Sequence, residues 1–130
     1  MRGEVSWQGE KKMVGTTSSG HNIDMDWNSG PTPMEITLQM AGACSMVDVI
    51  VGLKERNVTS ARVELEAVRA DETPRVFTHI KMKYIIEGEN LPEKLVQRLI
   101  EASQDRYCSV SLMLGSTAKI EWELELSNVE

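Results

Sequence analysis

The sequence predicts an α+β protein built from antiparallel sheets with one wet face and two helices. Three observations predict this class: period-two alternation in several short segments, helical periodicity in two longer ones, and strands before, between and after the helices. The 130 residues fit one domain. The glycine and proline clusters are too short for interdomain linkers, so we expect a single domain over residues 1–130.

Alternation of apolar and polar residues marks the strands. Near the start, Val5 and Trp7 share a face, and a second short strand is expected near residues 13–17. Four later segments place apolar side chains on one face and polar ones on the other, which favours antiparallel pairing. Their apolar members are Ile23, Met25 and Trp27; Val63, Leu65 and Ala67; Ile80, Met82, Tyr84 and Ile86; and Ile120, Trp122, Leu124 and Leu126.

Two segments have helical periodicity. The second, residues 92–107, opens with a proline and has an ordinary amphipathic stripe. The first, residues 33–56, is apolar on nearly every face. We expect one buried stripe on it, formed by Ile36, Met40, Ala43, Val47 and Ile50.

A helix that is apolar nearly all round must be buried nearly all round, and one small domain cannot easily enclose it. A membrane span is the alternative, but Gln39, Asp48 and two glycines interrupt the run. We therefore expect no membrane segment and predict a homodimer with extensive contact near this helix.

The composition excludes several functional classes. The net charge of −6 disfavours nucleic-acid binding, which needs a basic surface. No glycine-rich phosphate loop is present, so we expect no nucleotide cofactor, and neither His21 nor His79 has a second metal ligand at suitable spacing. The first ten residues have no apolar core of a signal peptide, so we expect a cytoplasmic protein with reduced thiols.

Cys44 and Cys108 are the only thiols, and they raise the question of redox chemistry. Free cysteines are most often small buried apolar residues. If the two met, one thiolate would be oxidised to sulfenic acid by a peroxide and the other would condense with it to a disulfide. The attacking thiol would need a lowered pKa, and so a cation or hydrogen-bond donor nearby. Asp48 would instead raise that pKa if it faced the sulfur. The candidate cations are Arg2, Lys11, Lys12, Arg75 and Arg106.

Two motifs carry a family resemblance. The first is Pro33-Met34-Glu35-Ile36 leading into Ala41-Gly42-Ala43-Cys44-Ser45-Met46, and the second is Tyr107-Cys108-Ser109-Val110-Ser111. Together they resemble the OsmC/Ohr family of osmotically inducible and organic hydroperoxide resistance proteins, in its small OsmC-like branch. The resemblance covers essentially the whole chain. It implies an intertwined homodimer whose sheets wrap around the central cysteine-bearing helices.

The resemblance also implies roles for both thiols. Cys44 takes the place of the peroxidatic cysteine and Cys108 that of the resolving one. The family reduces organic hydroperoxides in an apolar pocket at the dimer interface, with electrons returned by dithiols such as lipoylated proteins. Four methionines are available to line such a pocket: Met34, Met40, Met46 and Met113.

The activating residues depart from the family pattern. The family pairs an arginine of an early strand with a glutamate directly after the helix-start proline. Here the arginine position falls near Met13, and Met34 follows the proline, with the carboxylate one step later at Glu35. One residue turns a helix by about 100°, so Glu35 enters as a candidate site residue whose direction is open.

Two hypotheses of function follow. The first is a thiol peroxidase for organic hydroperoxides in oxidative-stress defence, with Cys44, Cys108 and Glu35 in the site. The second, favoured by the missing activating pair, is a non-catalytic dimer that binds a small or acyl ligand in an apolar interface pocket.

Overall fold

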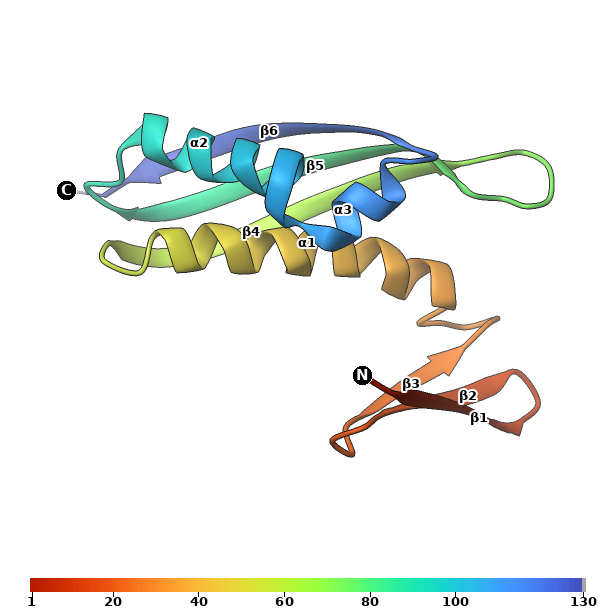
Figure 1. The fold of residues 1–130 in the computed structure, drawn as a ribbon. Coiled ribbons are helices and arrows are strands. Elements are labelled where there is room, and N and C mark those ends of the chain that lie inside the picture. Colours follow the sequence, from red (N-terminus) through yellow and green to blue (C-terminus); the bar gives the residue numbers. More distant parts are fainter. Residues whose placement is uncertain (130) are drawn as a thin grey trace. The chain divides into compact units, whose positions relative to one another are not determined.

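The computed structural model describes residues 1–129 and has the α+β architecture that the sequence predicts (Figure 1). Two compact units are present, Met1–Leu38 and the chain from Gln39 onward. The prediction of a single domain stays a prediction. In chain order the elements are β1 (Gly3–Gly9), β2 (Lys12–Thr17), β3 (Asn22–Asp26), α1 (Pro33–Gly52), β4 (Asn57–Arg69), β5 (Phe77–Glu89), α2 (Glu93–Ala102), a π-helical turn (Ser103–Tyr107), α3 (Ser109–Leu114) and β6 (Lys119–Asn128).

The first unit contains a three-stranded antiparallel sheet in the order β1-β2-β3. Trp7 pairs with Met13, and Met13 pairs with Met25 on the other side, so the predicted strands and their antiparallel pairing are confirmed. The β1–β2 turn places Gly9 and Glu10 at positive φ (97° and 51°). Glycine adopts this backbone region without steric cost.

Helix α1 begins with a capping box. Thr32 Oγ1 accepts the Glu35 amide at 3.2 Å, and Glu35 Oε1 accepts the Thr32 amide at 2.9 Å, so two free amides of the first turn are satisfied. The helix runs from Pro33 to Gly52, four residues shorter at its end than the predicted 33–56. The Thr32-x-x-Glu35 pattern is a signal in the sequence for this start.

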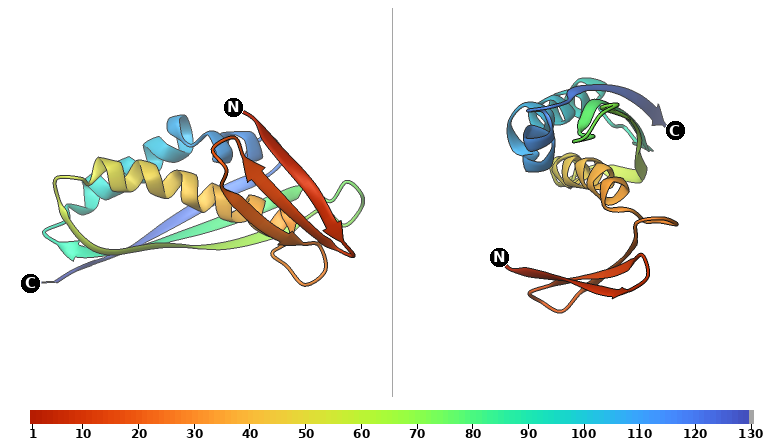
Figure 2. Two further views of the ribbon diagram at one scale, coloured as in Figure 1. Left: turned by 90° about the horizontal axis from the view of Figure 1, so that it is seen from below. Right: turned by 90° about the vertical axis from the view of Figure 1, so that its right-hand side faces the viewer.

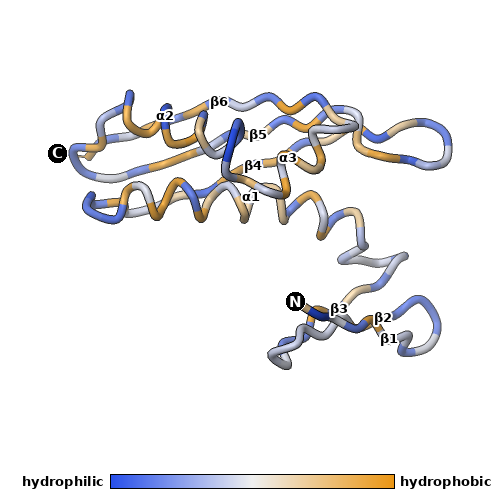
Figure 3. The backbone as a smooth tube through the Cα atoms, in the orientation of Figure 1, coloured by the Kyte–Doolittle hydropathy of each residue, from blue (hydrophilic) through white to orange (hydrophobic). Residues whose placement is uncertain are grey.

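The face of α1 that is buried is not the one that the sequence predicts. The residues buried on this helix are Ala41, Gly42, Ser45 and Val49. The predicted stripe was wrong for the single chain, because Met40, Ala43, Val47 and Ile50 are exposed and Ile36 is half-buried. Apolar residues follow one another along α1 (Figure 3), and they include both the buried Val49 and the exposed Val47, so hydrophobicity alone could not tell which face meets the sheet.

The second unit is built on a sheet in the order β4-β5-β6. The alternation predicted for β5 is confirmed, because Ile80, Met82, Tyr84 and Ile86 are buried. Strands β4 and β5 are antiparallel, but β6 runs parallel to β5, so the expectation of antiparallel pairing was wrong there. Parallel neighbours need a long crossover connection, and the helical segment between β5 and β6 supplies it.

The predicted second helix, residues 92–107, is divided. Helix α2 ends at Ala102, and a π-helical turn, Ser103–Tyr107, completes the segment. Cys108 then adopts an extended backbone (φ −77°, ψ 97°), and the short helix α3, which the sequence analysis missed, follows. A six-residue helix spans fewer than two turns, so its apolar residues show no clear period.

The core of the second unit lies between the helices and one face of the β4-β5-β6 sheet. Both views of Figure 2 place α1 and α2 on the same side of that sheet. Gly42 of α1 lies against Leu65 of β4, and Gly52 lies against Leu99 of α2. Glycine at these two positions leaves room for the two leucine side chains, so α1 approaches its neighbours closely there.

Helix α1 is also the one helix among residues 1–129 that is long and apolar enough to cross a membrane. This is weak support for a membrane span, because core helices of soluble proteins pass the same test.

We predict that Gly88→Ala destabilises the protein by about 1–3 kcal/mol. Gly88 is buried on β5, and a Cβ there would collide with the Asn57 carbonyl oxygen and lie 2.6 Å from Leu91 Cδ1. Urea unfolding at a fixed protein concentration measures the change in free energy. Gly3→Ala is the control, because its Cβ would meet Thr16 O at an ordinary 3.6 Å. Equal loss in both variants would contradict the prediction.

Candidate functional site

Two thiols from distant parts of the sequence meet at helix α1. The Cys108 thiol donates to the carbonyl oxygen of Ala41 at 3.8 Å, and Ala41 lies one turn before Cys44 on the same helix. Cys44 is half-buried, Cys108 is fully buried, and both are free. The Cys44 thiol is near enough to affect the ionisation of Cys108. The structure therefore brings together the two cysteines that the sequence singled out.

The local backbone holds Cys108 in place. Its amide donates to Ser103 O at 2.7 Å, which closes the π-helical turn. Its sulfur accepts the Ser111 amide at 3.4 Å and so caps helix α3. π-Helical turns occur often at functional sites. This one ends at Tyr107, directly before the buried Cys108.

Burial raises the pKa of the Cys108 thiol above its ordinary value. The Ser111 hydroxyl and amide act in the opposite direction, because they stabilise the thiolate, whereas the neighbouring Cys44 thiol raises the pKa further. At neutral pH the group is therefore protonated. A thiol in that state is a poor nucleophile until something removes its proton.

A buried polar network lies behind the thiols and joins α1 to β5 and to the π-helical turn. Ser45 Oγ is its centre, 2.5 Å from the Tyr84 hydroxyl and 2.9 Å from Ser103 Oγ. Gln104 Nε2 donates to the Tyr84 hydroxyl at 2.7 Å. Because Ser45 directly follows Cys44 and Ser103 lies five residues before Cys108, the network ties together the two segments that carry the thiols.

Asp48 also belongs to this network. Its Oδ2 accepts the Ser103 hydroxyl at 2.7 Å, so this carboxylate is used in holding the π-helical turn on α1. Tyr84 is buried, and burial raises the pKa of its phenol, with the Asp48 charge adding to the shift. The Tyr84 hydroxyl therefore stays neutral and keeps its hydrogen bonds.

Glu35 belongs to the first unit, whereas both thiols belong to the second. Its carboxylate is exposed and serves the capping box of α1. Among residues 1–129 the one ion pair is Lys119–Glu121, at 3.2 Å, so no candidate cation is paired with Glu35 in the described chain. A role for Glu35 beside Cys44, and the choice among the candidate cations, stay predictions.

Three of the candidate cations lie in the first unit: Arg2, Lys11 and Lys12. Arg75 Nε donates to Ala70 O at 3.2 Å between β4 and β5, and Arg106 is exposed in the π-helical turn.

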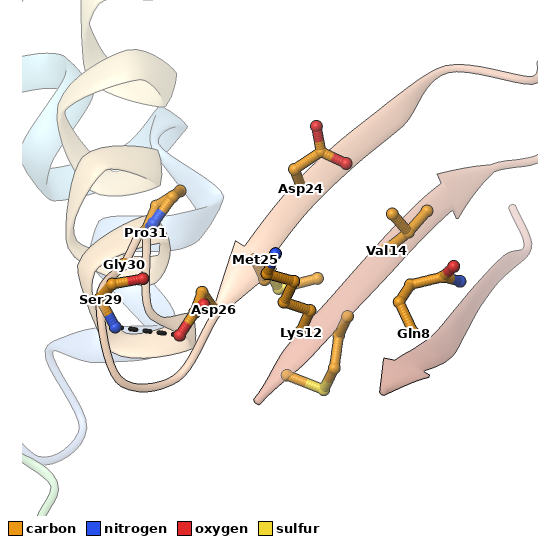
Figure 4. Close-up of a pocket in the computed structure, with 10 residues that line it drawn as sticks. Gln8, Lys12, Val14, Asp24, Met25, Asp26, Ser29, Gly30 and Pro31 are labelled. Atoms are coloured by element: carbon orange, nitrogen blue, oxygen red, sulfur yellow. Dashed lines mark hydrogen bonds between the residues drawn. The ribbon is translucent and has the colours of Figure 1, made fainter. Parts of the chain in front are cut away.

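A separate pocket of about 500 Å³ lies on the first unit, with residues of β1, β2, β3 and the following loop around it (Figure 4). Asp26 accepts the amides of Ser29 and Asn28, each at 2.9 Å, and these bonds lower the pKa of its carboxyl. The pocket is lined by neither thiol. The Asp26 carboxylate, which is bound within its own turn, does not by itself indicate a ligand.

The histidines have local partners. His21 Nδ1 lies 2.9 Å from Ser19 Oγ, and His79 Nδ1 lies 3.1 Å from Thr78 Oγ1. Within the described part of the chain, no three His, Cys, Asp or Glu side chains are grouped so that they could hold a metal ion.

The polar network is not predicted from the sequence. Ser45, Tyr84, Ser103 and Gln104 come from three separate elements and share no spacing that would link them. One signal was available: Tyr84 was predicted on the buried face of its strand, and a buried tyrosine hydroxyl needs a hydrogen-bond partner.

We predict that Tyr84→Phe destabilises the protein by roughly 1–2 kcal/mol, because Ser45 and Gln104 lose their shared partner in a buried site. Urea unfolding measures the loss. Tyr107→Phe is the matched control, since Tyr107 is 63% exposed and its change should leave stability within about 0.5 kcal/mol. A Tyr84→Phe protein as stable as the control would show that the network contributes little.

Comparisons with known proteins agree with the fold. The family model of the OsmC-like proteins matches residues 26–123. Protein YhfA of Escherichia coli strain K12 is 39% identical over 131 residues, which cover 97% of this chain and 98% of that protein.

Solved structures of similar shape include an OsmC-like protein from Mycoplasma pneumoniae. It has a TM-score of 0.82 and 16% identity, and the match covers 98% of this chain and 96% of that one. The organic hydroperoxide resistance protein OhrB of Bacillus subtilis has a TM-score of 0.62 and 17% identity, with coverage of 96% and 98%. At these identities the likeness shows the fold alone. Together with the family model and the YhfA match, it establishes that the chain belongs to the OsmC-like protein family.

Proposed function

We propose that this protein is a thiol-dependent peroxidase that reduces organic hydroperoxides, with Cys44 as the attacking thiol and Cys108 as the resolving thiol. The observation that carries the proposal is the meeting of the two free thiols at α1, where the Cys108 thiol donates to Ala41 O and the Cys44 thiol affects its ionisation. Cys44 is the more accessible of the two, which suits the thiol that meets the peroxide.

The proposed reaction has two steps in the protein. The Cys44 thiolate attacks the outer peroxide oxygen, the O–O bond breaks, and the products are a sulfenic acid and an alcohol once the alkoxide takes up a proton. Cys108 then attacks the Cys44 sulfur, the S–S bond forms and the S–O bond breaks, and the hydroxide leaves as water. A dithiol, in the lipoyl class or similar, returns two electrons by reducing the disulfide.

An apolar peroxide suits the surface around the thiols. Exposed methionines lie on the two helices that flank them, Met40 on α1 and Met113 on α3. Flexible thioether side chains adapt to irregular apolar ligands. We further propose that the protein works in the cytoplasm, in defence against oxidative stress, where dithiol reductants are available.

We predict that Cys44→Ser abolishes the consumption of cumene hydroperoxide in the presence of dithiothreitol. Cys108→Ser should still react once, because the sulfenic acid forms without the resolving thiol, and a dimedone adduct at Cys44 detects it by mass spectrometry. Unaltered protein should instead give an intramolecular disulfide, seen as the loss of two hydrogens.

Equal consumption by the unaltered protein and by Cys44→Ser would contradict the peroxidase proposal. That result, together with saturable binding of a fatty-acyl probe, would favour the alternative of a non-catalytic protein that binds a small or acyl ligand.

We also propose that the protein is a homodimer joined over the exposed face of α1. That face presents Met40, Val47, Ile50 and Val51, and α3 adds Leu112 and Met113. In the first unit, the β1-β2-β3 sheet also has exposed apolar side chains, among them Val5 and Trp7. Many exposed apolar side chains on one element, as on α1, usually mark an interface between subunits.

We predict that Val47→Glu shifts the protein from dimer to monomer in sedimentation velocity at micromolar concentration, because it places a charge in the apolar contact. Val68→Glu is the matched control: Val68 is 58% exposed, against 60% for Val47, but lies on β4. A monomeric unaltered protein, or a Val47→Glu variant that dimerises as well as the control, would overturn the proposed interface.

A further inference from the structure

The proposed resolving step requires Cys108 as a thiolate, but the surroundings of this thiol favour its protonated form. Cys108 is fully buried, and burial raises the pKa of its thiol. The titratable side chains that face it from neighbouring elements are Cys44 of α1 and Tyr84 of β5, with Asp48 acting on Tyr84 from α1. None of these groups is a cation. If Cys108 is to attack, its thiolate needs stabilisation from a neutral donor.

Ser111 is placed to be that donor. Its amide donates to Cys108 Sγ at 3.4 Å, which fixes the serine next to the sulfur on the first turn of α3. Its side chain is 2% exposed, and among the described residues its hydroxyl oxygen has no hydrogen-bond partner. Rotation of the serine side chain about χ1 can bring its hydroxyl toward a negative charge that forms on the adjacent sulfur.

An unpartnered buried hydroxyl costs free energy, so its presence at this position calls for an explanation. In the resting thiol state Cys108 donates its own hydrogen to Ala41 O and leaves the serine without a strong acceptor. A thiolate is a much better acceptor, and hydrogen bonds to ionised groups are shorter and stronger than neutral ones. The serine hydroxyl therefore gains its partner only when Cys108 loses its proton. Both the hydroxyl and the amide of Ser111 lower the pKa of this thiol.

We propose that Ser111 is a third catalytic residue of the redox site, whose hydroxyl and amide stabilise the Cys108 thiolate as it attacks the oxidised Cys44. This inference rests on the proposed peroxidase function. As the S–S bond forms and the S–O bond of the sulfenic acid breaks, the departing hydroxide takes up the proton released by Cys108, and water leaves. Ser111 neither gains nor loses a proton in the net step.

The first test needs no peroxide. In a Cys44→Ser background, Cys108 is the only thiol, and the ultraviolet absorbance of its thiolate against pH gives its pKa directly. Ser111→Ala removes the hydroxyl and should raise this pKa by about one unit, which leaves roughly tenfold less thiolate at a given pH. Ser111→Thr keeps a hydroxyl and should restore much of the effect. Ser109→Ala, an exposed position on the same helix, is the matched control.

The second test uses the protein with both cysteines and one equivalent of cumene hydroperoxide. Ser111→Ala should form the sulfenic acid at the unaltered rate but close the disulfide about tenfold more slowly at neutral pH, with the deficit shrinking as pH rises. A merely structural serine would not give this pH dependence.

A Cys108 pKa that is the same in Ser111→Ala as in Ser109→Ala would overturn the role of Ser111, as would an unchanged rate of disulfide closure. If the thiolate responds to Ser111 but no variant consumes peroxide, the proposed function fails while the stabilisation of the thiolate stands.

Discussion

The hydrogen bonds between α1 and the π-helical turn are the constraint on which the thiol site depends. Cys108 lies outside the sheet, in an extended stretch between two short helical segments, and has no regular element of its own to fix it. The Ser103 side chain is hydrogen-bonded to Ser45 and Asp48 of α1. The turn before Cys108 is therefore bound to the helix that carries Cys44, which directly precedes Ser45. Without these contacts the two sulfurs would depend on apolar packing, which resists sliding less than directional hydrogen bonds do.

The same arrangement explains why the site is polar at its back and apolar at its front. Behind the thiols, Ser45, Tyr84, Ser103 and Gln104 satisfy one another inside the core. A buried network of this kind is stable only when its members are all paired, so it fixes one geometry. In front, α1 presents Val47 and Ile50 outward. The proposed reaction with an apolar peroxide requires both a rigid support and an apolar approach.

Much of the fold could be predicted from the sequence, because alternation in segments such as Ile80 to Ile86 reports directly on a half-buried strand. The pairing direction of β6 could not be predicted, because a strand with one wet face has the same alternating pattern whether its neighbour is parallel or antiparallel. The buried side of α1 was also beyond prediction, because Val47 and Val49 are equally apolar and only the sheet decides between them. Within the site, the cysteines carried a motif, but Tyr84 and Ser103 are brought to Ser45 only by tertiary structure.

The parallel pairing of β5 with β6 has a consequence for how the chain folds. Strand β6 cannot join the sheet through a tight turn, so everything between Glu89 and Lys119 has to close as one long loop first. Contacts of such high sequence separation slow folding, and an unpaired β5 edge is exposed in the meantime. Cys108 lies inside that loop and Cys44 lies before β5 on α1, so the meeting of the two thiols is itself a contact of high sequence separation.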